Sequence, residues 1–391
     1  MDRRLLVLAL GMFALGTDSF VMAGVLPQLA HSFHIGIGEA GQVTTVYAIT
    51  YALMAPTIAA LAAHIPRKTL LLSSLGIFVI ANLATALAPT FGFALVTRVI
   101  AGIGAAMFAP TATGSAASIV APEKRGMALA IVITGLTVST ALGTPIGAMI
   151  GGLGDWRWTM VFVSALALAS MIGVGALLAH IPLPPRLTLA QRIAPVRDPR
   201  VALTLITTLI YQAGHFICYT YFTVVFDRVL GHDHTLLVGA LLVLWGGSGM
   251  VANLVTGRLA DKIGNRRVIT TLLVALTAVM VMLPFTSGNL ALSFIGVALW
   301  GAFAWGLLAP QQHRLVTIAP QSAPVVLGLN TSATYLGVTA AGVIGALAMP
   351  SVGGHNLGFV SAGFVVVGLV VAELATFLIE RRTFGRAGAS A

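Results

Sequence analysis

Residues 257–267 read GRLADKIGNRR and separate two apolar stretches, residues 235–257 and 267–286. Each stretch is long enough to cross a bilayer, because a membrane-spanning helix needs about 20 mainly apolar residues. The short segment between them carries four basic residues and one acidic residue: Arg258, Lys262, Arg266, Arg267 and Asp261. Lys and Arg concentrate in the cytoplasmic loops of membrane proteins. The pattern therefore predicts two membrane helices joined by a cytoplasmic loop.

The composition of the whole chain agrees with this local pattern. Of the 391 residues, 58% are hydrophobic and 8% are charged, whereas soluble domains have roughly 45–50% apolar and about 25% charged residues. These values exclude a soluble globular enzyme. The single cysteine, Cys218, excludes a disulfide framework. The start of the chain imitates a signal peptide, but its apolar run carries Asp18 and lacks a convincing cleavage site, so we expect a retained first helix.

Polar, Pro or Gly clusters divide the chain into twelve apolar stretches. Their continuous length predicts helices, since a membrane β-strand would need only about 10 alternating residues. The predicted fold class is an all-α integral membrane protein with twelve transmembrane helices. The predicted spans are residues 5–30, 40–63, 68–89, 92–119, 125–152, 157–180, 200–226, 235–257, 267–286, 290–312, 323–349 and 356–379.

The longest predicted cytoplasmic connection, about residues 181–199, is rich in proline and arginine. It divides the chain into two six-helix bundles, which we expect to comprise residues 1–180 and 200–391. A short basic segment after the second helix of each half, at residues 66–68 and 264–267, is a second sign of an internal repeat. Two such bundles with a cavity between them at mid-membrane form the architecture of parallel-repeat secondary transporters.

The net charge of +10 follows the predicted topology. An even number of spans puts both termini on one side, and of the 21 Lys and Arg residues all but Arg98, Arg157 and Arg228 then belong to that side. The positive-inside rule identifies this side as the cytoplasm. The charge therefore indicates orientation in a bilayer and contact with anionic lipid head groups, and not binding to nucleic acid.

The segment 257–267 resembles the signature of the major facilitator superfamily, in the copy that joins helices eight and nine. The matching residues are Gly257, Asp261, Gly264, Arg266 and Arg267. The resemblance implies the major facilitator fold of two six-helix bundles, with a loop that latches the bundles together in the outward-facing state. The first-half copy, residues 59–68, has Ala63 and His64 at the acidic and basic positions, so a latch charge is missing there.

The predicted fifth helix contains a second motif, formed by Gly143, Pro145, Gly147 and Gly151. It resembles the antiporter motif of the drug:proton antiporter branch. Proline removes an intrahelical hydrogen bond and glycine removes bulk, so we expect a bend and close packing against a helix of the other bundle. Membrane helices in general are also rich in Gly and Pro. Residues 11–160 are similar to arabinose-efflux-like and chloramphenicol-efflux-like permeases.

Three Asp, Glu, Lys or Arg residues lie well inside the predicted spans: Asp18, Arg98 and Glu373. Arg98 begins a segment similar to the helix-four arginine motif of the family. Burial disfavours a charged carboxylate and a nearby guanidinium favours it, so Asp18 could change protonation as its surroundings alternate. We hypothesise that Asp18 carries the coupling proton; the alternative is a fixed pair with Arg98 or a substrate-orienting acceptor. We expect Glu373 to pack against a helix or reach the interface, not to form a second proton site.

Aromatic and polar side chains at helical spacing are candidates for a substrate cavity. Tyr211, His215 and Tyr219 are spaced i, i+4, i+8 and share one helix face. Core packing is the alternative for each candidate. The full set is Phe20, Met22, Tyr47, Tyr51, Met107, Phe108, Tyr211, Gln212, His215, Tyr219, Trp300, Phe303, Asn330 and Thr334.

The sequence shows no metal cluster, nucleophilic triad or phosphate-binding loop. We therefore predict that the protein is not an enzyme, needs no cofactor and uses the proton gradient as its energy source. The predicted function is export of small amphipathic molecules in exchange for protons by alternating access. Drug-like molecules are expected, with compounds of the chloramphenicol type as one candidate. The alternatives are a sugar or metabolite efflux permease and a non-transporting receptor or scaffold. We expect a monomeric, multi-pass protein of the bacterial inner membrane.

Overall fold

The computed structural model describes residues 2–179, 181, 187–230 and 235–387. Within these residues the regular structure is entirely helical, without a strand. Twelve helices among them are long and apolar enough to cross a membrane. The predicted fold class is thereby confirmed. Residues 182–186 of the predicted linker lie outside the described residues.

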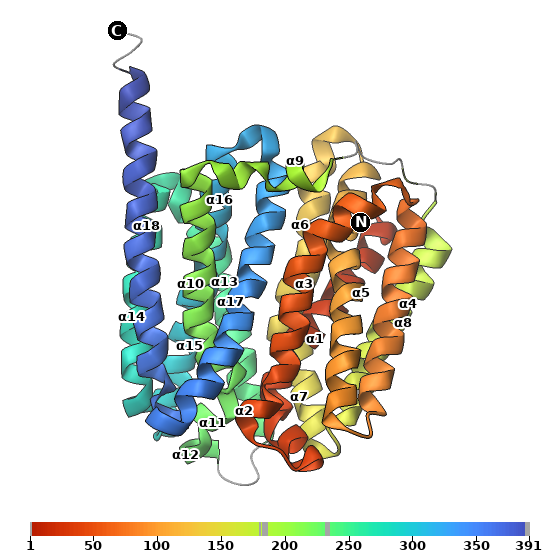
Figure 1. The fold of residues 1–391 in the computed structure, drawn as a ribbon, viewed down its shortest axis with the longest axis vertical. Coiled ribbons are helices and arrows are strands. Elements are labelled where there is room, and N and C mark those ends of the chain that lie inside the picture. The colour runs from red at the N-terminus through yellow and green to blue at the C-terminus, as the bar shows by residue number, and fades with distance from the viewer. Residues whose placement is uncertain (1, 180, 182–186, 231–234, 388–391) are drawn as a thin grey trace.

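Six membrane-length helices occupy the first half of the chain (Figure 1). Two of them are assembled from shorter consecutive pieces. The elements of this half are α1 (Arg3–Phe33), α2 (Ile37–Ala40), α3 (Gln42–Leu61), η1 (Ala62–His64), α4 (Arg67–Ala86), α5 (Phe91–Ser118), η2 (Pro122–Lys124), α6 (Arg125–Val138), η3 (Ser139–Gly143), α7 (Thr144–Leu153) and α8 (Arg157–Leu177).

The second half repeats this arrangement after a connection formed by α9 (Leu189–Ile193) and η4 (Ala194–Arg197). Figure 1 shows α9 crossing one end of the molecule between the two groups of helices. The elements of the second half are α10 (Pro199–Thr220), α11 (Phe222–Val225), α12 (Asp227–Leu230), α13 (Thr235–Ile263), α14 (Asn265–Thr286), α15 (Leu290–Gly306), α16 (Leu308–Ile318), η5 (Pro320–Ser322), α17 (Ala323–Val352), η6 (Gly354–Asn356) and α18 (Leu357–Ala387).

Polar side chains at the ends of the apolar stretches start several helices. Asp2, Thr90, Asp198 and Asn289 are N-caps whose side chains accept a hydrogen bond from the first turn of α1, α5, α10 and α15. Such a cap satisfies a backbone N–H group that has no partner within the helix. The guanidinium of Arg4, which also hydrogen-bonds to Asp2, lowers the pKa of that carboxyl.

Several predicted boundaries differ from the structure. The helix predicted to end at residue 257 continues as α13 to Ile263. Gly264, with a φ of 88°, then interrupts the helical backbone before α14 begins. The tenth span continues to Ile318 and not to residue 312. The seventh ends at Thr220, with two short helices after it. Polar residues near a membrane surface do not by themselves end a helix, so hydropathy ended the eighth and tenth spans several residues too early.

The two halves use the same set of helix contacts. In the first half α1 packs on α6 and α8, α3 on α5, and α4 on α8. In the second half α10 packs on α17 and α18, α13 on α15, and α14 on α18. When the spans are numbered one to six in each half, these are the same four pairs. The structure therefore contains a parallel internal repeat of the kind found in secondary transporters.

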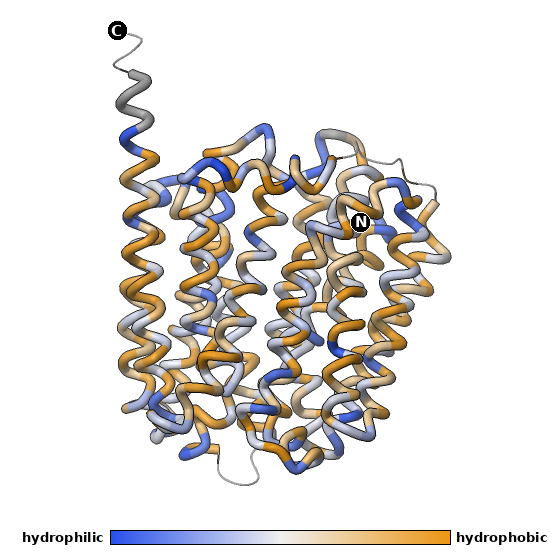
Figure 2. Tube along the Cα trace, viewed as in Figure 1, coloured by the Kyte–Doolittle hydropathy of each residue, from blue (hydrophilic) through white to orange (hydrophobic). Residues whose placement is uncertain are grey.

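Large apolar side chains remain on the outside of the helices. Ile80, Leu254, Phe285 and Leu347 are each more than 60% exposed. Figure 2 shows apolar residues along the length of the bundle and hydrophilic residues gathered at its two ends. An apolar exterior of this size suits a lipid environment, because water would penalise it strongly.

The halves contact each other mainly through α3 with α17 and through α7 and η3 with α13. Both termini lie at one side of the molecule, the terminus side (Figure 1). A methyl group added at Gly342 would lie 2.0 Å from Thr45 Oγ1, and one at Gly246 would lie 2.2 Å from the Thr140 carbonyl oxygen. These close approaches lie between the middle of the spans and the side opposite the termini. We call the whole contact surface between the two halves the seam.

Candidate functional site

A buried ion pair lies within the first half. Arg98 Nη1 on α5 donates a hydrogen bond to Asp18 Oδ1 on α1 at 2.7 Å and another to Asn82 Oδ1 on α4 at 3.2 Å. The guanidinium carbon of Arg98 also lies 4.5 Å from the ring centroid of Tyr47 on α3. The Asp18 side chain is 0% exposed and that of Arg98 is 1% exposed. Four helices therefore converge on this pair.

Two polar atoms of the ion pair lack a hydrogen-bond partner in the part of the chain that the structure describes. Asp18 Oδ2 and Arg98 Nε are both buried and have no hydrogen-bond partner among the described residues. Burying a charged group is costly unless it is fully paired. Ionisable residues at membrane depth mark ion or substrate pathways in many transporters. The structure thus contains the Asp18–Arg98 pair that the sequence offered as one alternative. The role of Asp18 in proton transfer stays a prediction.

The next residue, Ser19, contacts both halves of the molecule. Its hydroxyl donates to the Leu15 carbonyl at 2.9 Å and lies 3.2 Å from the hydroxyl of Tyr47. It also lies 3.1 Å from the hydroxyl of Tyr335, which belongs to α17 of the second half. Tyr335 stacks on Tyr51, with ring centroids 4.0 Å apart.

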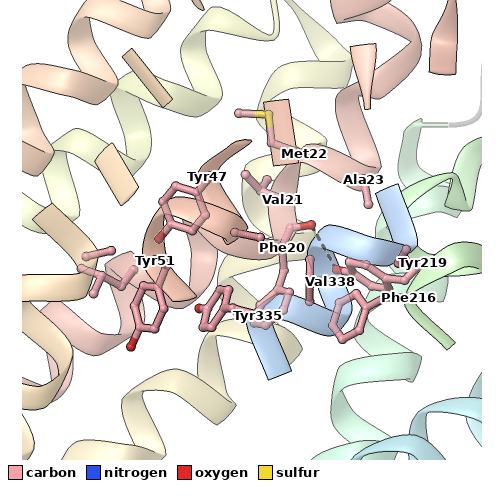
Figure 3. Packing of buried hydrophobic residues seen from close by; sticks show 14 of the residues in the cluster. Phe20, Val21, Met22, Ala23, Tyr47, Tyr51, Phe216, Tyr219, Tyr335 and Val338 are labelled. Carbon is pink, nitrogen blue, oxygen red and sulfur yellow. Dashed lines mark hydrogen bonds between the residues drawn. The ribbon is translucent and has the colours of Figure 1, made fainter. Parts of the chain in front are cut away.

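Phe20 projects from α1 into a group of rings from the second half (Figure 3). Its centroid lies 5.9 Å from Phe216, 6.1 Å from Tyr219 and 5.7 Å from Trp305. The hydroxyl of Tyr219 donates to the Phe20 carbonyl at 3.1 Å. Further rings extend this group, which we call the aromatic cluster: Phe20, Phe216, Tyr219, Trp245, Trp300 and Trp305.

The predicted stripe on the seventh helix borders this cluster. His215 lies 6.2 Å from Tyr211 and 6.4 Å from Trp245 by ring centroids. Its Nε2 atom is hydrogen-bonded to Gln212 Oε1. The Tyr211 hydroxyl and His215 Nδ1 are buried without a partner among the described residues. Tyr211, His215 and Tyr219, which the helical spacing placed on one face, therefore lie in one region of the structure.

Other candidates for the cavity lie elsewhere. The ring of Phe108 occupies the space beside Gly11 within the first half. Met22 is buried and points away from the aromatic cluster (Figure 3). Asn330 accepts a hydrogen bond from Thr208 at 2.8 Å. Thr334 donates a hydrogen bond to the Asn330 carbonyl of its own helix at 3.1 Å. Packing and hydrogen bonding inside the protein explain why Phe108, Met22 and Asn330 are buried. Met107 and Phe303 are half-buried.

The glycines of the helix-five motif face a helix of their own half. Methyl groups added at Gly143, Gly147 and Gly151 would meet Thr17, Val21 and Val25, all on α1 of the same half. The helix does pack against α13 of the other half, but through Thr140 and Met149. A π-helical turn, η3, ends at Gly143 immediately before Pro145 in the first turn of α7. The irregular turn coincides with the predicted bend.

The signature residues 257–267 make their contacts inside the second half. Arg266 pairs with Glu373 at 2.9 Å and with Glu380 at 3.0 Å, both on α18. Asp261 is exposed, and its Oδ1 atom lies 4.0 Å from His313 Nε2.

The remaining residues of this signature lie near the helix junction. A methyl group at Gly257 would lie 3.5 Å from Ala309, Gly264 forms the turn, and Arg267 is exposed. None of these contacts crosses the seam among the described residues, so this conformation does not use the predicted latch. Glu373 bridges helices near the terminus side, as expected, and also accepts a hydrogen bond from Thr270.

Sequence reasoning missed four residues of these sites. Asn82, Ser19 and Tyr335 are uncharged, so a count of charged residues inside the predicted spans does not include them. Arg314 was assigned to a cytoplasmic segment, but it lies in α16 and is 4% exposed. Its Nη2 donates to Thr376 Oγ1 at 2.8 Å. The helical spacing of Gln311 and Arg314, both buried, was an available signal.

The profile of the Major Facilitator Superfamily matches residues 8–342, most of the chain. The chain belongs to the major facilitator superfamily. An uncharacterized MFS-type transporter, YbcL of Bacillus subtilis (strain 168), is 30% identical over 353 residues, covering 89% of each chain. The inner membrane transport protein YdhP of Escherichia coli (strain K12) is 29% identical over 355 residues, covering 91% of this chain and 90% of YdhP.

Solved structures show the same major facilitator fold at lower identity. A bacterial homolog of the human lysosomal transporter Spinster, in an inward-facing and unoccupied conformation, has a TM-score of 0.75 and 16% identity, covering 95% of this chain and 96% of its own. The human organic anion transporter MFSD10 has a TM-score of 0.70 and 16% identity, covering 95% and 99%. The chain is thus a multi-pass membrane protein of a transporter superfamily.

Proposed function

We propose that this transporter exports small amphipathic ring compounds in exchange for protons by alternating access. The observation that carries the proposal is the position of Asp18. Among the described residues it is the only fully buried acid. It is adjacent in sequence to Ser19 and Phe20, which contact the other half across the seam. A protonation change at this carboxyl would therefore occur beside the surface along which the halves must move.

The ion pair suits a proton carrier. When Asp18 is charged, Arg98 compensates it at 2.7 Å. When Asp18 takes up a proton, the guanidinium retains the Asn82 oxygen at 3.2 Å and the Tyr47 ring. These remaining partners lower the cost of an unpaired arginine inside the protein. A membrane potential would supply about 2.3 kcal/mol per charge per 100 mV to such a cycle.

The aromatic cluster supports a substrate with a ring and hydrogen-bond acceptors. The indole N–H groups of Trp245, Trp300 and Trp305 are buried without an acceptor among the described residues. An unsatisfied buried donor costs about 1–3 kcal/mol, which an acceptor oxygen on a substrate would recover. Asp18, the one buried acid in the described part of the chain, is already paired with Arg98. These features favour neutral or anionic ring compounds, including those of the chloramphenicol type, over cations.

A sugar or metabolite efflux permease is the second candidate. Sugar binding would need several free amide or acidic groups. Both amides among the cavity candidates already have partners: Asn330 is bonded to Thr208, and Gln212 is bonded to His215. The aromatic character of the seam thus favours the first candidate. Nothing in the described residues specifically favours a receptor or scaffold.

We further propose that the terminus side faces the cytoplasm and that the protein acts as a monomer in the bacterial inner membrane. The distribution of Lys and Arg supports this orientation. The similarity to YdhP, an inner membrane transport protein, supports the location. In this proposal the proton gradient replaces any cofactor, and the partners are protons, lipids and the small-molecule substrate.

The test is substrate-driven proton movement in proteoliposomes with an imposed pH gradient. Candidate compounds come first from a growth-inhibition panel with the protein overexpressed. Neutral and anionic aromatic compounds with acceptor oxygens are expected to move protons, whereas permanent cations and sugars are not. Proton movement driven by sugars alone would favour the second candidate. No proton movement with any compound would overturn the antiport proposal.

A further inference from the structure

Three consecutive residues of α1 contact three different parts of the molecule. Asp18 pairs with Arg98 on α5, within the first half. Ser19 contacts Tyr47 on α3 and Tyr335 on α17. Phe20 accepts a hydrogen bond through its carbonyl and packs on rings of the second half. Ser19 is the member whose side-chain oxygen lies within hydrogen-bond distance of both halves.

A continuous set of contacts joins the ion pair to the second half. The guanidinium of Arg98 lies over the ring of Tyr47, with 4.5 Å between its carbon and the ring centroid. The hydroxyl of Tyr47 lies 3.2 Å from Ser19 Oγ, which lies 3.1 Å from the hydroxyl of Tyr335. All four side chains, including that of Arg98, are buried.

Because these side chains are buried, the loss of one contact disturbs the others. A buried hydroxyl that loses its partner cannot turn to bulk water, so its hydrogen bond is costly to break. The position of Tyr47 depends on Arg98, and the position of Arg98 depends on the charge of Asp18. A change at the ion pair would therefore alter the geometry at Ser19, where the second half is attached.

We propose that Ser19 and Tyr335 are positioning residues that transmit the state of the Asp18–Arg98 pair to the second half of the molecule. Their hydrogen bond holds the seam closed while Asp18 is charged and weakens when Asp18 is neutral. This inference rests on the proposed change of protonation at Asp18. The ionisable side chains that contact Ser19 are Tyr47 and Tyr335, Arg98 contacts Tyr47, and Tyr51 packs on Tyr335.

A disulfide across the seam can report closure without any transport assay. A methyl group at Gly38 would lie 3.3 Å from Ala346 Cβ, close to the Cβ separation of about 3.5–4.5 Å in disulfides. The reporter is therefore Gly38→Cys with Ala346→Cys, in the full-length protein with Cys218→Ala so that no other thiol competes. The rate of cross-linking by a mild oxidant measures how often the seam is closed.

Tyr335→Phe removes only the hydroxyl and keeps the ring that stacks on Tyr51. We expect it to lower the cross-linking rate about two- to tenfold, the range for one hydrogen bond. Ser19→Ala is expected to have the same effect and serves if Tyr335→Phe does not fold. The matched control is Ser332→Ala, which removes a buried hydroxyl of α17 that has no partner among the described residues. Its rate should equal that of the parent.

The decisive comparison combines Tyr335→Phe with Asp18→Asn. Asp18→Asn alone should lower the rate, and the double variant should be no slower than the slower single variant, because both act through one contact. Fold-changes that multiply would overturn the inference, as would an unchanged rate in either single variant. The readout requires neither protons nor substrate, so it can succeed or fail independently of the antiport proposal.

Discussion

At the residue scale, Asp18 and Arg98 depend on each other because neither reaches water. Replacing Arg98 by Met would leave a buried carboxylate without its counter-charge, which typically costs about 3–5 kcal/mol. We expect this variant to melt well below the wild type in detergent, as followed by tryptophan fluorescence. The double change Asp18→Asn with Arg98→Met should recover part of the loss.

The control for this prediction is Asp155→Asn. Its carboxylate pairs with Arg157 at 3.3 Å, but both side chains are at least one third exposed. Exposed pairs contribute about 0–1 kcal/mol, so its melting temperature should stay near that of the wild type. Equal melting of Arg98→Met and Asp155→Asn would contradict the assigned burial of the Asp18–Arg98 pair.

The sequence allowed the ion pair to be anticipated because charged residues in apolar stretches are rare and few partners were available. The bond between Ser19 and Tyr335 could not be anticipated in the same way. The two residues are 316 positions apart, and serine and tyrosine are ordinary in membrane helices. Which face of α17 meets α1 depends on the packing of several helices, and that information is not local.

At the element scale, close packing of α1 against α6 depends on small residues, and Gly135 makes the closest backbone approach. A methyl group added at Gly135 would lie 2.1 Å from the carbonyl oxygen of Ala9. Backbone cannot move aside as a side chain can, so we expect Gly135→Ala to destabilise the protein by about 1–3 kcal/mol. Thermal melting in detergent measures the effect.

Gly126 on the same helix provides the matched substitution. A methyl group there would meet nothing within 4 Å. Gly126→Ala should therefore be neutral or stabilising, by up to about 1 kcal/mol, because alanine favours a helix. If the two variants melted alike, the assigned contact between α1 and α6 would be wrong.

The element boundaries show where hydropathy loses information. Gln311, Gln312 and His313 end the tenth apolar stretch in the sequence, yet α16 continues through them and buries Arg314. We expect Arg314→Met to lower the melting temperature more than Arg266→Gln. Arg314 bonds across to Thr376 inside the protein, whereas Arg266 is 54% exposed and its pairs are screened. The reverse order would contradict the burial of Arg314.

At the scale of the whole molecule, the twelve spans and the internal repeat were accessible from sequence because length and apolar content are global properties. The conformation could not be predicted from the sequence, because the signature 257–267 implied a latch that the described contacts do not form. The same helix pairs recur in both halves, and the seam between them closes the side away from the termini. Relative motion of two such halves is the expected transport movement.

The orientation of the whole molecule can be tested with reporters. A reporter fused after the last residue should be active in the cytoplasm, while one inserted after Gly288, in the turn between α14 and α15, should be active only outside it. The distribution of Lys and Arg is the physical reason. The opposite pattern at both positions would reverse the proposed topology.

Proton coupling through Asp18 is tested most directly by comparing two transport modes in proteoliposomes, using a substrate identified by the growth panel. The wild type should carry out both substrate counterflow and uphill transport driven by a pH gradient. Asp18→Asn should retain counterflow and lose uphill transport, because exchange needs only the moving halves and accumulation needs the proton. Undiminished uphill transport in Asp18→Asn would contradict the proposal.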